Sequence, residues 1–407
     1  MSGCSSAMER ASILRAMKAI RLISLLAVAA CAAAQTPVSA PAVWQMQESG
    51  TTAGLRGIDS VDGTVAWASG TGGTVLRTID GGAHWTKCAV PDAAKDGATL
   101  DFRGVQAWDA TTAIVMSSGK GKLSRLYKTK DGCKAWKIVL KNREKGGFWD
   151  GLYFDRGEVG WLIGDPVGGR FSLFRTEDRG RDWYKQINKG LGADGKMQGL
   201  FAASNSSLVA YGGFVNFGSG GSVGAFVYGV TSFSICIDCT FERSDYEGRQ
   251  TQWIRQSVPL KGNSDSSGVF SIGSRASSAD HPAGKDILVV VGGDFTKPNE
   301  PQGTAASRLE YDGPWISSAT PPHGFRSAVQ WSESLKAWIT VGTNGSDISH
   351  DDGKTWQPLD DGNWNALSLP FVVGPNGRIG RINPAAVPAT VTSVSSQSAK
   401  ASPGTVK

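Results

Sequence analysis

Residues 78–85 read Thr78-Ile-Asp80-Gly-Gly82-Ala-His-Trp85, and their pattern returns three more times along the 407-residue chain. The later copies are Thr129-Lys-Asp131-Gly-Cys-Lys-Ala-Trp136, Thr176-Glu-Asp178-Arg-Gly180-Arg-Asp-Trp183 and Ser349-His-Asp351-Asp-Gly353-Lys-Thr-Trp356. Each copy follows a strand-like stretch, such as Thr74-Val-Leu-Arg77. Four copies in register predict a fold built from repeated units. The second copy departs from the pattern, because Cys133 stands where the others have glycine.

The residue types of this pattern suit a turn between two strands. The aspartate can accept hydrogen bonds from backbone N–H groups, the glycine supplies a positive φ, and the tryptophan starts the next strand and packs over the turn. The pattern resembles the Asp-box, or bacterial neuraminidase repeat, and this resemblance implies a position on the outer rim, away from any active face. We therefore expect structural roles for Asp80, Trp85, Asp131, Trp136, Asp178, Trp183, Asp351 and Trp356.

The tryptophans set the period of the repeat. Degenerate copies end at Trp253 and Trp315, and Trp44 stands near the start of the globular part. Seven equivalent tryptophans then follow one another at intervals of 41, 51, 47, 70, 62 and 41 residues. This spacing predicts an all-β fold, a seven-bladed β-propeller in which each blade has four short strands. The last blade lacks a fourth strand, which Val43-Trp44-Gln-Met-Gln47 at the N-terminus would supply, removing an open sheet edge.

Composition agrees with many short strands and tight turns. The chain has 53 Gly and 14 Trp, is 40% apolar and only 19% charged, which excludes disorder and collagen and disfavours a helical bundle. Its net charge of +6 falls to +1 over residues 35–383, so we expect no clustered basic surface and no nucleic-acid partner. Nucleophile motifs, phosphate loops and metal clusters give no convincing signal, so we expect no cofactor and no metal.

The N-terminus has the features of an export signal. Lys18 and Arg21 precede an apolar run, residues 22–30, which is too short to span a bilayer, and Cys31-Ala-Ala-Ala-Gln35 follows. Cleavage after Ala34 would release a periplasmic or secreted protein with no transmembrane helix. Val28-Ala-Ala-Cys31 also resembles a bacterial lipobox, which would make the protein an outer-membrane lipoprotein anchored at Cys31. The start codon, Met1 or Met17, stays open.

These features divide the chain into three parts. We expect a signal peptide over residues 1–34, the propeller over 35–383 and a disordered tail over 384–407, which is rich in Ala, Ser, Thr, Val and Pro. Export makes the cysteines beyond the signal disulfide candidates. Cys236-Ile-Asp-Cys239 suits a local staple better than a zinc site or a redox pair, with free thiols as the alternative. The sequence leaves open whether Cys88 pairs with Cys133.

Each unit begins with a similar strand in which one polar residue precedes a small one. Aligned on the small residue, these positions are Arg56, Arg103, Asp150, Gln198, Ser267, Arg326 and Asn365. On the innermost strands of a propeller they would face the central channel. The functional interpretation is a site for an anion or an acidic peptide, because guanidinium groups bind carboxylates bidentately. The alternative is a wet channel lined by polar side chains, with Asp150 paired to a neighbouring arginine.

The export signal, the seven units, the "LRGI" and "FRGV" inner strands and the "GWLIG" second strands resemble the photosystem II stability/assembly factor family of propellers. The resemblance covers residues 43–383. It implies a non-enzymatic lumenal or periplasmic propeller that binds a protein partner, such as a subunit of a membrane complex, with arginines on the binding surface. We expect a monomer.

Two other classes of function remain open. The first is a glycoside hydrolase resembling the sialidases, in which Arg56, Arg103 and Arg326 would imitate the substrate-binding triad. Against it, the chain lacks the Phe/Tyr-Arg-Ile-Pro segment of sialidases, and Tyr246-Glu247 falls in a long excursion from the blades. The second is a lipid-anchored structural propeller with no small ligand.

Overall fold

The computed structural model describes residues 41–91, 96, 99–155, 157–186, 189–211, 214–230, 252–275, 286–310 and 313–388. The chain divides into two compact units, Met1–Pro41 and Ala42–Lys407, and every described strand belongs to the second. The expected signal peptide with Cys31, the Cys236–Cys239 pair and Tyr246-Glu247 lie outside the described residues. In the described part of the chain, no helix combines the length and apolarity needed to cross a bilayer.

Five four-stranded antiparallel sheets hold most of the described strands. They are formed by β2 (Leu55–Ser60), β3 (Ala66–Gly70), β4 (Thr74–Thr78) and β5 (Thr86–Cys88); by β6 (Asp101–Ala107), β7 (Ala113–Ser118), β8 (Arg125–Thr129) and β9 (Lys137–Lys141); by β10 (Trp149–Phe154), β11 (Gly160–Val167), β12 (Arg170–Thr176) and β13 (Tyr184–Lys185); by β23 (Ala328–Ser332), β24 (Ala337–Gly342), β25 (Gly345–Ser349) and β26 (Gln357–Asp360); and by β27 (Ala366–Ser368), β28 (Phe371–Val373), β29 (Ile379–Ile382) and β1 (Trp44–Gln47).

The remaining strands form one nine-stranded sheet that contains two more runs of four. The first run is β15 (Leu208–Tyr211), β16 (Phe214–Gly221), β17 (Phe226–Val230) and β18 (Trp253–Ser257). The second is β19 (Ser264–Arg275), β20 (Ile287–Asp294), β21 (Ala305–Arg308) and β22 (Ile316–Ser317). One short pairing joins the runs, because β16 also pairs with β19. The two-residue strand β14 (Gln198–Gly199) pairs with β16 as well. Short 3₁₀ helices, η1 (Gly121–Leu123) and η2 (Gly195–Met197), lie between strands.

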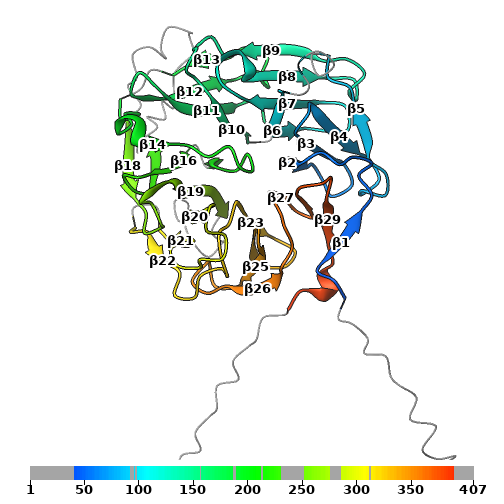
Figure 1. Cartoon of the computed structure of the whole chain (residues 1–407). Coiled ribbons are helices and arrows are strands. Elements are labelled where there is room, and N and C mark those ends of the chain that lie inside the picture. The colour runs from blue at the N-terminus through cyan, green and yellow to red at the C-terminus, as the bar shows by residue number, and fades with distance from the viewer. Residues whose placement is uncertain are drawn as a thin grey trace, which may run out of the picture. The chain divides into compact units, whose positions relative to one another are not determined.

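The first strands of successive runs form a closed circle. β2 contacts β6, β6 contacts β10, and the contacts continue through β15, β19, β23 and β27 back to β2. Figure 1 shows the sheets following one another around this circle in chain order. The predicted all-β propeller is therefore confirmed, and the seven tryptophans stand at or next to the start of the outermost strand of each run, or within β1.

The N-terminal strand completes the last sheet, as the sequence predicted. β1 pairs antiparallel with β29, and Trp44 lies opposite Ile382. The indole of Trp44 also donates a 3.1 Å hydrogen bond to the hydroxyl of Ser346 in the preceding sheet. After β29 the chain continues into a short 3₁₀ helix, η4 (Pro384–Ala386), capped by Asn383. The ordered chain thus extends beyond residue 383, into the start of the stretch expected to be disordered.

The four turns formed by the repeated Ser/Thr-x-Asp pattern, which we call box turns, share one hydrogen-bond pattern. In the first, Thr78 Oγ1 donates to Asp80 Oδ1 at 2.8 Å, and the same oxygen accepts from the His84 backbone N–H at 3.0 Å. The Gly82 N–H closes the turn on Thr78 Oγ1 at 2.9 Å. Equivalent bonds recur in the turns that contain Asp131, Asp178 and Asp351. The bonds from His84, first its backbone and then its side chain, lower the pKa of Asp80 to about 2, as expected of a structural carboxylate.

The cysteine in the second turn forms a disulfide with Cys88, with Cα atoms 5.6 Å apart. The bridge joins β5 of the first blade to the turn of the second, which answers the question that the sequence left open. Cys133 has a φ of 67°, in the left-handed region where the other three turns place glycine. The cysteine's thiol explains why a residue with a side chain occupies this position. Closing a loop of 45 residues contributes about 4 kcal/mol in the chain-entropy model.

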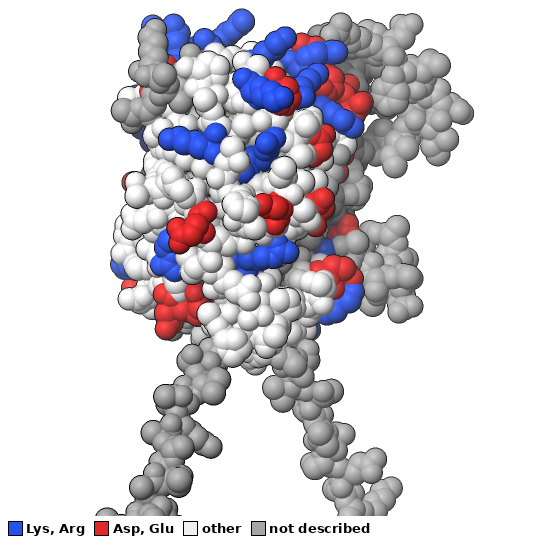
Figure 2. Space-filling view, turned by 90° about the vertical axis from the view of Figure 1, so that its right-hand side faces the viewer, with Lys and Arg blue, Asp and Glu red and all other residues white. Residues whose placement is uncertain are grey.

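The hydrophobic core lies between adjacent blades. Trp67 of β3 packs with Phe102 of β6 and Tyr127 of β8 in one cluster, and similar clusters recur around the circle. The second-strand tryptophans Trp67, Trp161 and Trp338 are all buried. On the surface, Lys and Arg are concentrated at the top of the view in Figure 2, which is the end of the molecule where Figure 1 shows β8, β9 and β13.

Candidate binding site at the inner strands

The segment before β15 occupies the axis of the propeller. The side chain of Asn205 donates to the Val105 carbonyl of β6 at 3.3 Å and accepts from the Leu152 N–H of β10 at 2.8 Å. Ser204 Oγ donates to the Ser327 carbonyl, just before β23, at 2.6 Å. One segment thus contacts the inner strands of three blades.

Three of the predicted ring residues occupy equivalent places. The pairing of each inner strand with its neighbour shifts register by one residue, between Leu55 and Gly57, between Phe102 and Gly104, and between Trp149 and Gly151. The extra residue in each bulge is Arg56, Arg103 or Asp150. A bulge takes a side chain out of the regular alternation and aims it separately. The sequence alignment was right at these positions.

Two other ring residues lie elsewhere. In β19 the register shift falls between Val269 and Ser271, so Phe270 and not Ser267 takes the bulged position. Gln198 belongs to β14, ahead of the inner strand β15, and its amide donates to Ser219 and Tyr228 inside the blade. Asn365 does lie at the start of its inner strand, where its amide donates a 2.7 Å hydrogen bond to the Leu55 carbonyl of the first blade.

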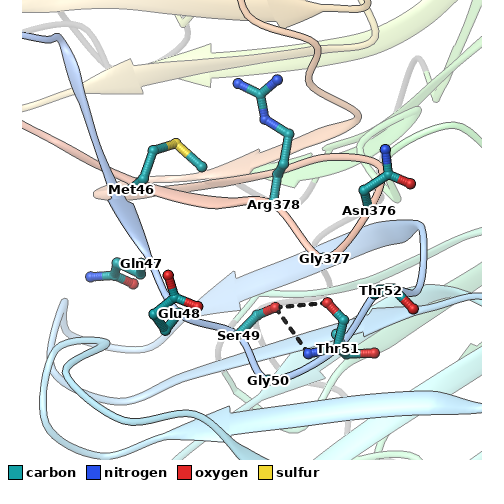
Figure 3. A pocket seen from close by; sticks show the side chains of 10 residues that line it. All are labelled: Met46, Gln47, Glu48, Ser49, Gly50, Thr51, Thr52, Asn376, Gly377 and Arg378. Carbon is teal, nitrogen blue, oxygen red and sulfur yellow. Dashed lines mark hydrogen bonds between the residues drawn. The ribbon is translucent and has the colours of Figure 1, made fainter.

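A pocket of about 550 Å³ lies where the ring closes, apart from these residues (Figure 3). It is lined by the connection between β1 and β2 and by the turn before β29. Ser49 and Thr51 hydrogen-bond to each other within it, and the guanidinium of Arg378 lies 4.5 Å from the ring centroid of Trp364. None of the predicted ring residues lines this pocket, so it is not part of the arginine site.

Arg326 is one residue out of register with Arg56. Gly342 lies against the Phe325 carbonyl and the Cα of Arg326, in the way that Gly70 lies against the Gly54 carbonyl and the Cα of Leu55. Arg326 therefore matches Leu55, a buried core position. A slip of one residue in a strand turns a side chain to the opposite face, and the Arg326 side chain is fully buried. The structure thus removes Arg326 from the predicted ring.

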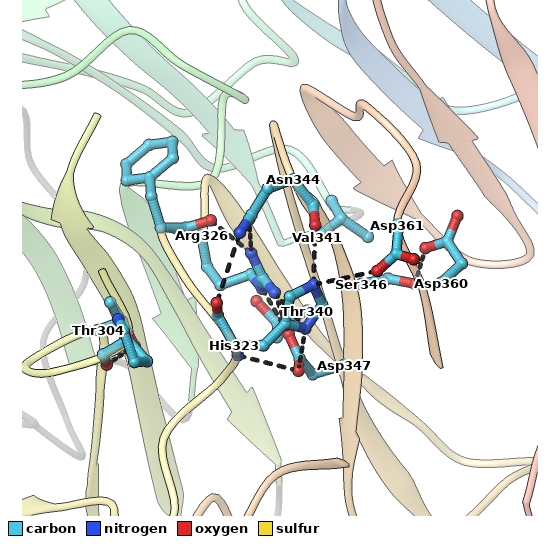
Figure 4. Close-up of polar contacts among 12 residues, drawn as sticks. Thr304, His323, Arg326, Thr340, Val341, Asn344, Ser346, Asp347, Asp360 and Asp361 are labelled. Carbon is cyan, nitrogen blue, oxygen red and sulfur yellow. Dashed lines mark hydrogen bonds and ion pairs between the residues drawn. The ribbon is translucent and has the colours of Figure 1, made fainter. Parts of the chain in front are cut away.

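Inside the blade, acceptors surround the guanidinium of Arg326 (Figure 4). Its Nε donates to Asp347 Oδ2 at 2.6 Å, and its Nη2 forms an ion pair with the same carboxylate. Its Nη1 donates to the Phe325 carbonyl at 2.6 Å and to Asn344 Oδ1 at 2.5 Å. Burial lowers the pKa of Arg326, and the charge of Asp347 opposes this shift. Arg326 is thus a structural residue with no donor directed at a ligand.

His323 extends this network toward the surface. Its Nδ1 lies 2.7 Å from Asp347 Oδ1, and its Nε2 lies 2.7 Å from the Asn344 carbonyl oxygen. Carboxylate and carbonyl oxygens only accept, so the protonated ring, with two N–H groups, satisfies both contacts. The hydrogen bond to Asp347 raises the pKa of His323, whereas burial and Arg326 act in the opposite direction. The two acceptors thus favour a charged ring, whereas the Nη2 donor of Arg326, 2.9 Å from Nδ1, opposes it.

Arg56 and Arg103 share a single carboxylate, that of Asp101 at the start of β6. Arg56 Nε lies 3.2 Å from Asp101 Oδ1, and Arg103 Nε donates to Asp101 Oδ2 at 2.8 Å. Arg103 Nη1 donates to the Ala202 carbonyl in the axial segment at 3.0 Å. The side chains of Arg56 and Arg103 are 32% and 28% exposed. Burial lowers the pKa of Arg56, Asp101 raises it, and the charge of Arg103 lowers it again.

This arrangement leaves guanidinium donors for a ligand. Among the described residues, no atom accepts a hydrogen bond from Nη1 or Nη2 of Arg56 or from Nη2 of Arg103. Two cations beside one anion keep a local excess of positive charge. Donors in a planar fork suit a carboxylate. Asp101 was missed in the sequence, although it stands two residues before Arg103, the spacing that places strand residues on one face.

Asp150 is buried and does not form the expected ion pair with an arginine. Its side chain is 1% exposed, and its Oδ2 has no hydrogen-bond partner among the described residues. Burial, and next the charge of Asp165, hold the pKa of Asp150 well above its usual range, while Arg103 acts in the opposite direction. Asp165 accepts from the Leu200 N–H at 2.9 Å, and burial raises its pKa as well. The carboxylate that pairs with the arginines is that of Asp101.

Aromatic side chains gather around β19, on runs of strands that do not adjoin those of Arg56 and Arg103. Phe270 stacks on Phe201 with ring centroids 3.9 Å apart and meets Phe325 edge-on at 4.7 Å. Phe295, which directly follows β20, is half exposed and 6.2 Å from Phe270. The pairing of Ser267 with Asp294 places the end of β20 beside the start of β19. The starts of the inner strands therefore carry cationic side chains on two blades and aromatic ones on others.

The chain resembles known proteins in sequence and in fold. No family model matches the chain. The photosystem II assembly lipoprotein Ycf48 of Synechococcus sp. (strain CC9902) is 24% identical over 191 residues, which make up 46% of this chain and 52% of that protein. The matched region thus spans about half the length of this curated relative.

Solved structures show the same fold. A structure of YCF48 bound to a D1 peptide superposes with a TM-score of 0.53 at 18% identity, covering 84% of this chain and 99% of that one. The GH74 xyloglucanase of Xanthomonas campestris superposes with a TM-score of 0.51 at 14% identity, covering 84% of this chain and 54% of that one. The chain is therefore a β-propeller homologous to the photosystem II assembly factor Ycf48, as its resemblance to that family predicted.

Proposed function

We propose that this protein is a non-enzymatic, protein-binding propeller of the assembly-factor type, and that Arg56 and Arg103 hold an acidic group of its partner. The observation that carries the proposal is the pair of guanidinium groups that share one carboxylate and keep donors directed away from it. A carboxylate of a partner would meet these donors at the channel mouth. We propose a subunit of a membrane complex as the partner, in line with the relative that binds a D1 peptide.

The aromatic side chains give the site a second part. An acidic peptide that reached Arg56 and Arg103 could place an apolar residue against the half-exposed Phe295. Aromatic anchors and arginines are the residue types that dominate binding energy in protein interfaces. The axial segment closes the channel below the site, so the peptide would lie across the mouth rather than thread through it.

The experiment is affinity purification of the tagged protein from detergent-solubilised membranes of its own organism, with partners identified by mass spectrometry. The variant Arg56→Gln/Arg103→Gln is expected to lose recovery of the partner at least about ten-fold, because each lost charged hydrogen bond costs about 1.5–3 kcal/mol. The matched control is Arg170→Gln/Arg255→Gln, which removes two exposed arginines from the outer part of the blades. Equal recovery by both variants would contradict the proposal.

The hydrolase alternative has its own test. Turnover of a panel of fluorogenic sialosides and β-glycosides, abolished in Asp150→Asn, would overturn the non-enzymatic proposal. The burial of Asp150 disfavours this outcome, because a catalytic carboxyl must contact its substrate. The likeness to the xyloglucanase concerns the fold alone.

We also propose that the protein is exported, either released by cleavage after Ala34 or anchored through Cys31. The sequence of residues 18–35 and the Cys88–Cys133 disulfide support export, since disulfides persist in oxidising compartments. The mass of the mature N-terminus distinguishes the two forms, because only the anchored form begins with an acylated cysteine. A mature protein that retains residues 1–34 would contradict both.

A further inference from the structure

The second blade contains a cluster of positive charge, although the net charge of residues 35–383 is close to zero. Residues 120–145 include ten lysines and arginines and two acids, a net charge of +8, although residues 35–383 together carry only +1. The expectation that no clustered basic surface remains was therefore wrong for this blade. The ten cations are Lys120, Lys122, Arg125, Lys128, Lys130, Lys134, Lys137, Lys141, Arg143 and Lys145.

Eight of these cations are exposed and form no ion pair within the described part of the chain. Arg125 pairs with Asp96 at 2.9 Å, and Lys128 is buried with its ammonium 5.1 Å from the ring centroid of Trp108. No described acid forms an ion pair with any of the other eight, which we call the basic edge: Lys120, Lys122, Lys130, Lys134, Lys137, Lys141, Arg143 and Lys145.

The two acids of the segment offset the basic edge only in part, since hydrogen bonds from Ala135 and Thr129, and after them the charge of Lys134, lower the pKa of Asp131. Asp131 accepts hydrogen bonds inside its own turn, from the Thr129 hydroxyl and the Ala135 N–H. Glu144 forms an ion pair with Lys185 of the third blade. Burial, and next the charge of Lys130, lower the pKa of Lys128 to about 8, which agrees with a high local density of positive charge.

Two lysines of the basic edge lie on the outermost strand of the blade, β9, where they do not favour folding. Lys137 and Lys141 of β9 lie directly opposite Lys128 and Arg125 of β8. Like charges in opposite positions of an antiparallel pair destabilise it. A single lysine on an edge strand deters association with another sheet, and each outermost strand of the other blades has at most one cation, as β5 and β13 illustrate. The excess on the second blade needs another explanation.

We propose that the basic edge is a docking surface for an anionic lipid bilayer. A polybasic surface gains attraction from every cation near a negatively charged membrane. Seven of the eight residues are lysines, compact point charges that are depleted in protein interfaces, where arginine forks recognise carboxylates. Ile138 of β9, 37% exposed between Lys137 and Lys141, provides an apolar side chain that can enter the headgroup region.

Nucleic acid fits this surface less well. Proteins that bind single strands stack bases on exposed aromatic side chains, and the aromatic residues of this segment, Tyr127 and Trp136, are buried. Lys137 and Lys141 of the basic edge lie on the outermost strand β9 and its other six residues lie in the connections of the second blade, whereas Arg56 and Arg103 lie on inner strands. The inference thus goes beyond the proposed function and is independent of it, and the protein could bind a membrane and a partner together.

The experiment is flotation of the full-length protein with vesicles made of equal parts phosphatidylglycerol and phosphatidylcholine. We expect binding in low salt, loss of binding in high salt because the charges are screened, and no binding to pure phosphatidylcholine. The variant Lys134→Gln/Lys137→Gln/Lys141→Gln/Arg143→Gln is expected to weaken partitioning about five-fold for each cation removed. The charge-retaining variant Lys134→Arg/Lys137→Arg/Lys141→Arg/Arg143→Lys should bind the vesicles as the wild type does.

The matched control removes four exposed lysines from other blades, Lys196→Gln/Lys297→Gln/Lys336→Gln/Lys354→Gln, and changes the net charge equally. All variants share the same N-terminus, so an anchor there contributes equally, and unchanged thermal unfolding shows that each is folded. Equal loss in both quadruple variants would overturn the proposal, because net charge alone would explain binding. Preference of the wild type for duplex DNA or polyglutamate over the vesicles would also overturn it. Arg56→Gln/Arg103→Gln should leave flotation unchanged, so the two proposals fail separately.

Discussion

Arg326 and Arg56 come from similar motifs at the starts of inner strands, yet the structure gives them opposite roles. Arg326 is fully buried, and acceptors from Asp347, Asn344 and Phe325 satisfy its guanidinium. Arg56 is one-third exposed and shares Asp101 with Arg103, which leaves donors unused. The comparison shows that the supply of acceptors decides whether an arginine holds the fold together or is available to a partner. A register difference of one residue is enough to change that supply.

The largest expected effect comes from removing the buried arginine. Arg326→Met would break a fully buried ion pair and leave Asp347 with only the partly exposed His323 beside it, and breaking such a pair destabilises a protein by about 3–5 kcal/mol. Urea unfolding, followed by tryptophan fluorescence, measures this loss. The double variant Arg326→Met/Asp347→Leu should recover most of it, because no buried charge is left alone. A stable Arg326→Met protein that failed to recover its partner would instead return Arg326 to the binding site.

A smaller effect is expected at the shared carboxylate. Asp101→Asn removes only a partly exposed ion pair, so the free energy of unfolding should change by less than about 1 kcal/mol. The same change frees both Nε groups and increases the local positive charge, so recovery of an acidic partner should rise. Quantitative affinity purification beside Arg56→Gln/Arg103→Gln checks this. Loss of recovery in Asp101→Asn would mean that Asp101 positions the arginines for binding.

The smallest effect is a dependence on pH near His323. Its pKa is raised in the folded protein, chiefly by the hydrogen bond to Asp347, so its stabilising contribution is complete below the unfolded pKa of about 6.5. This stabilising contribution disappears as the pH rises through the pKa of His323 in the folded protein, which lies above 6.5. Melting temperatures of the wild type and His323→Gln should therefore differ by about 1–2 °C in mild acid and converge in mild base. A difference that grows with pH would contradict the protonated ring.

The fold was predictable because its signals are local. Each repeated turn requires a particular φ and a particular set of hydrogen bonds, so residues of the types of Asp80, Gly82 and Trp85 recur at the same spacing in the other copies. The departure at Cys133 instead has its cause 45 residues away, in the bridge to Cys88, which the sequence alone left open. The closing strand at Trp44 could be found because the last blade was one strand short.

The site was only partly predictable, because register and long-range contacts decide it. Aligning Arg326-Ser327 with Arg56-Gly57 matched residue types, but the contact of Gly342 with Phe325 sets the true register. Asn205 has a φ of 65°, and its side chain hydrogen-bonds to the inner strands of two other blades. No local sequence pattern predicts such contacts. The basic edge could not be predicted from the net charge of residues 35–383, because charges in water interact over only about 10 Å at moderate salt.

The pairing of β1 with β29 has a consequence for how the protein is made. The first and last strands of the propeller belong to one sheet, so the N-terminal strand has no partner until Ile382 has been synthesised. The hydrogen bond from Asn365 to Leu55 likewise spans 310 positions. Contacts so distant along the chain form slowly, and unfinished sheet edges favour aggregation. The nascent chain must therefore remain open for almost its whole passage from the ribosome, and loss of the last strand would leave the first one permanently unpaired.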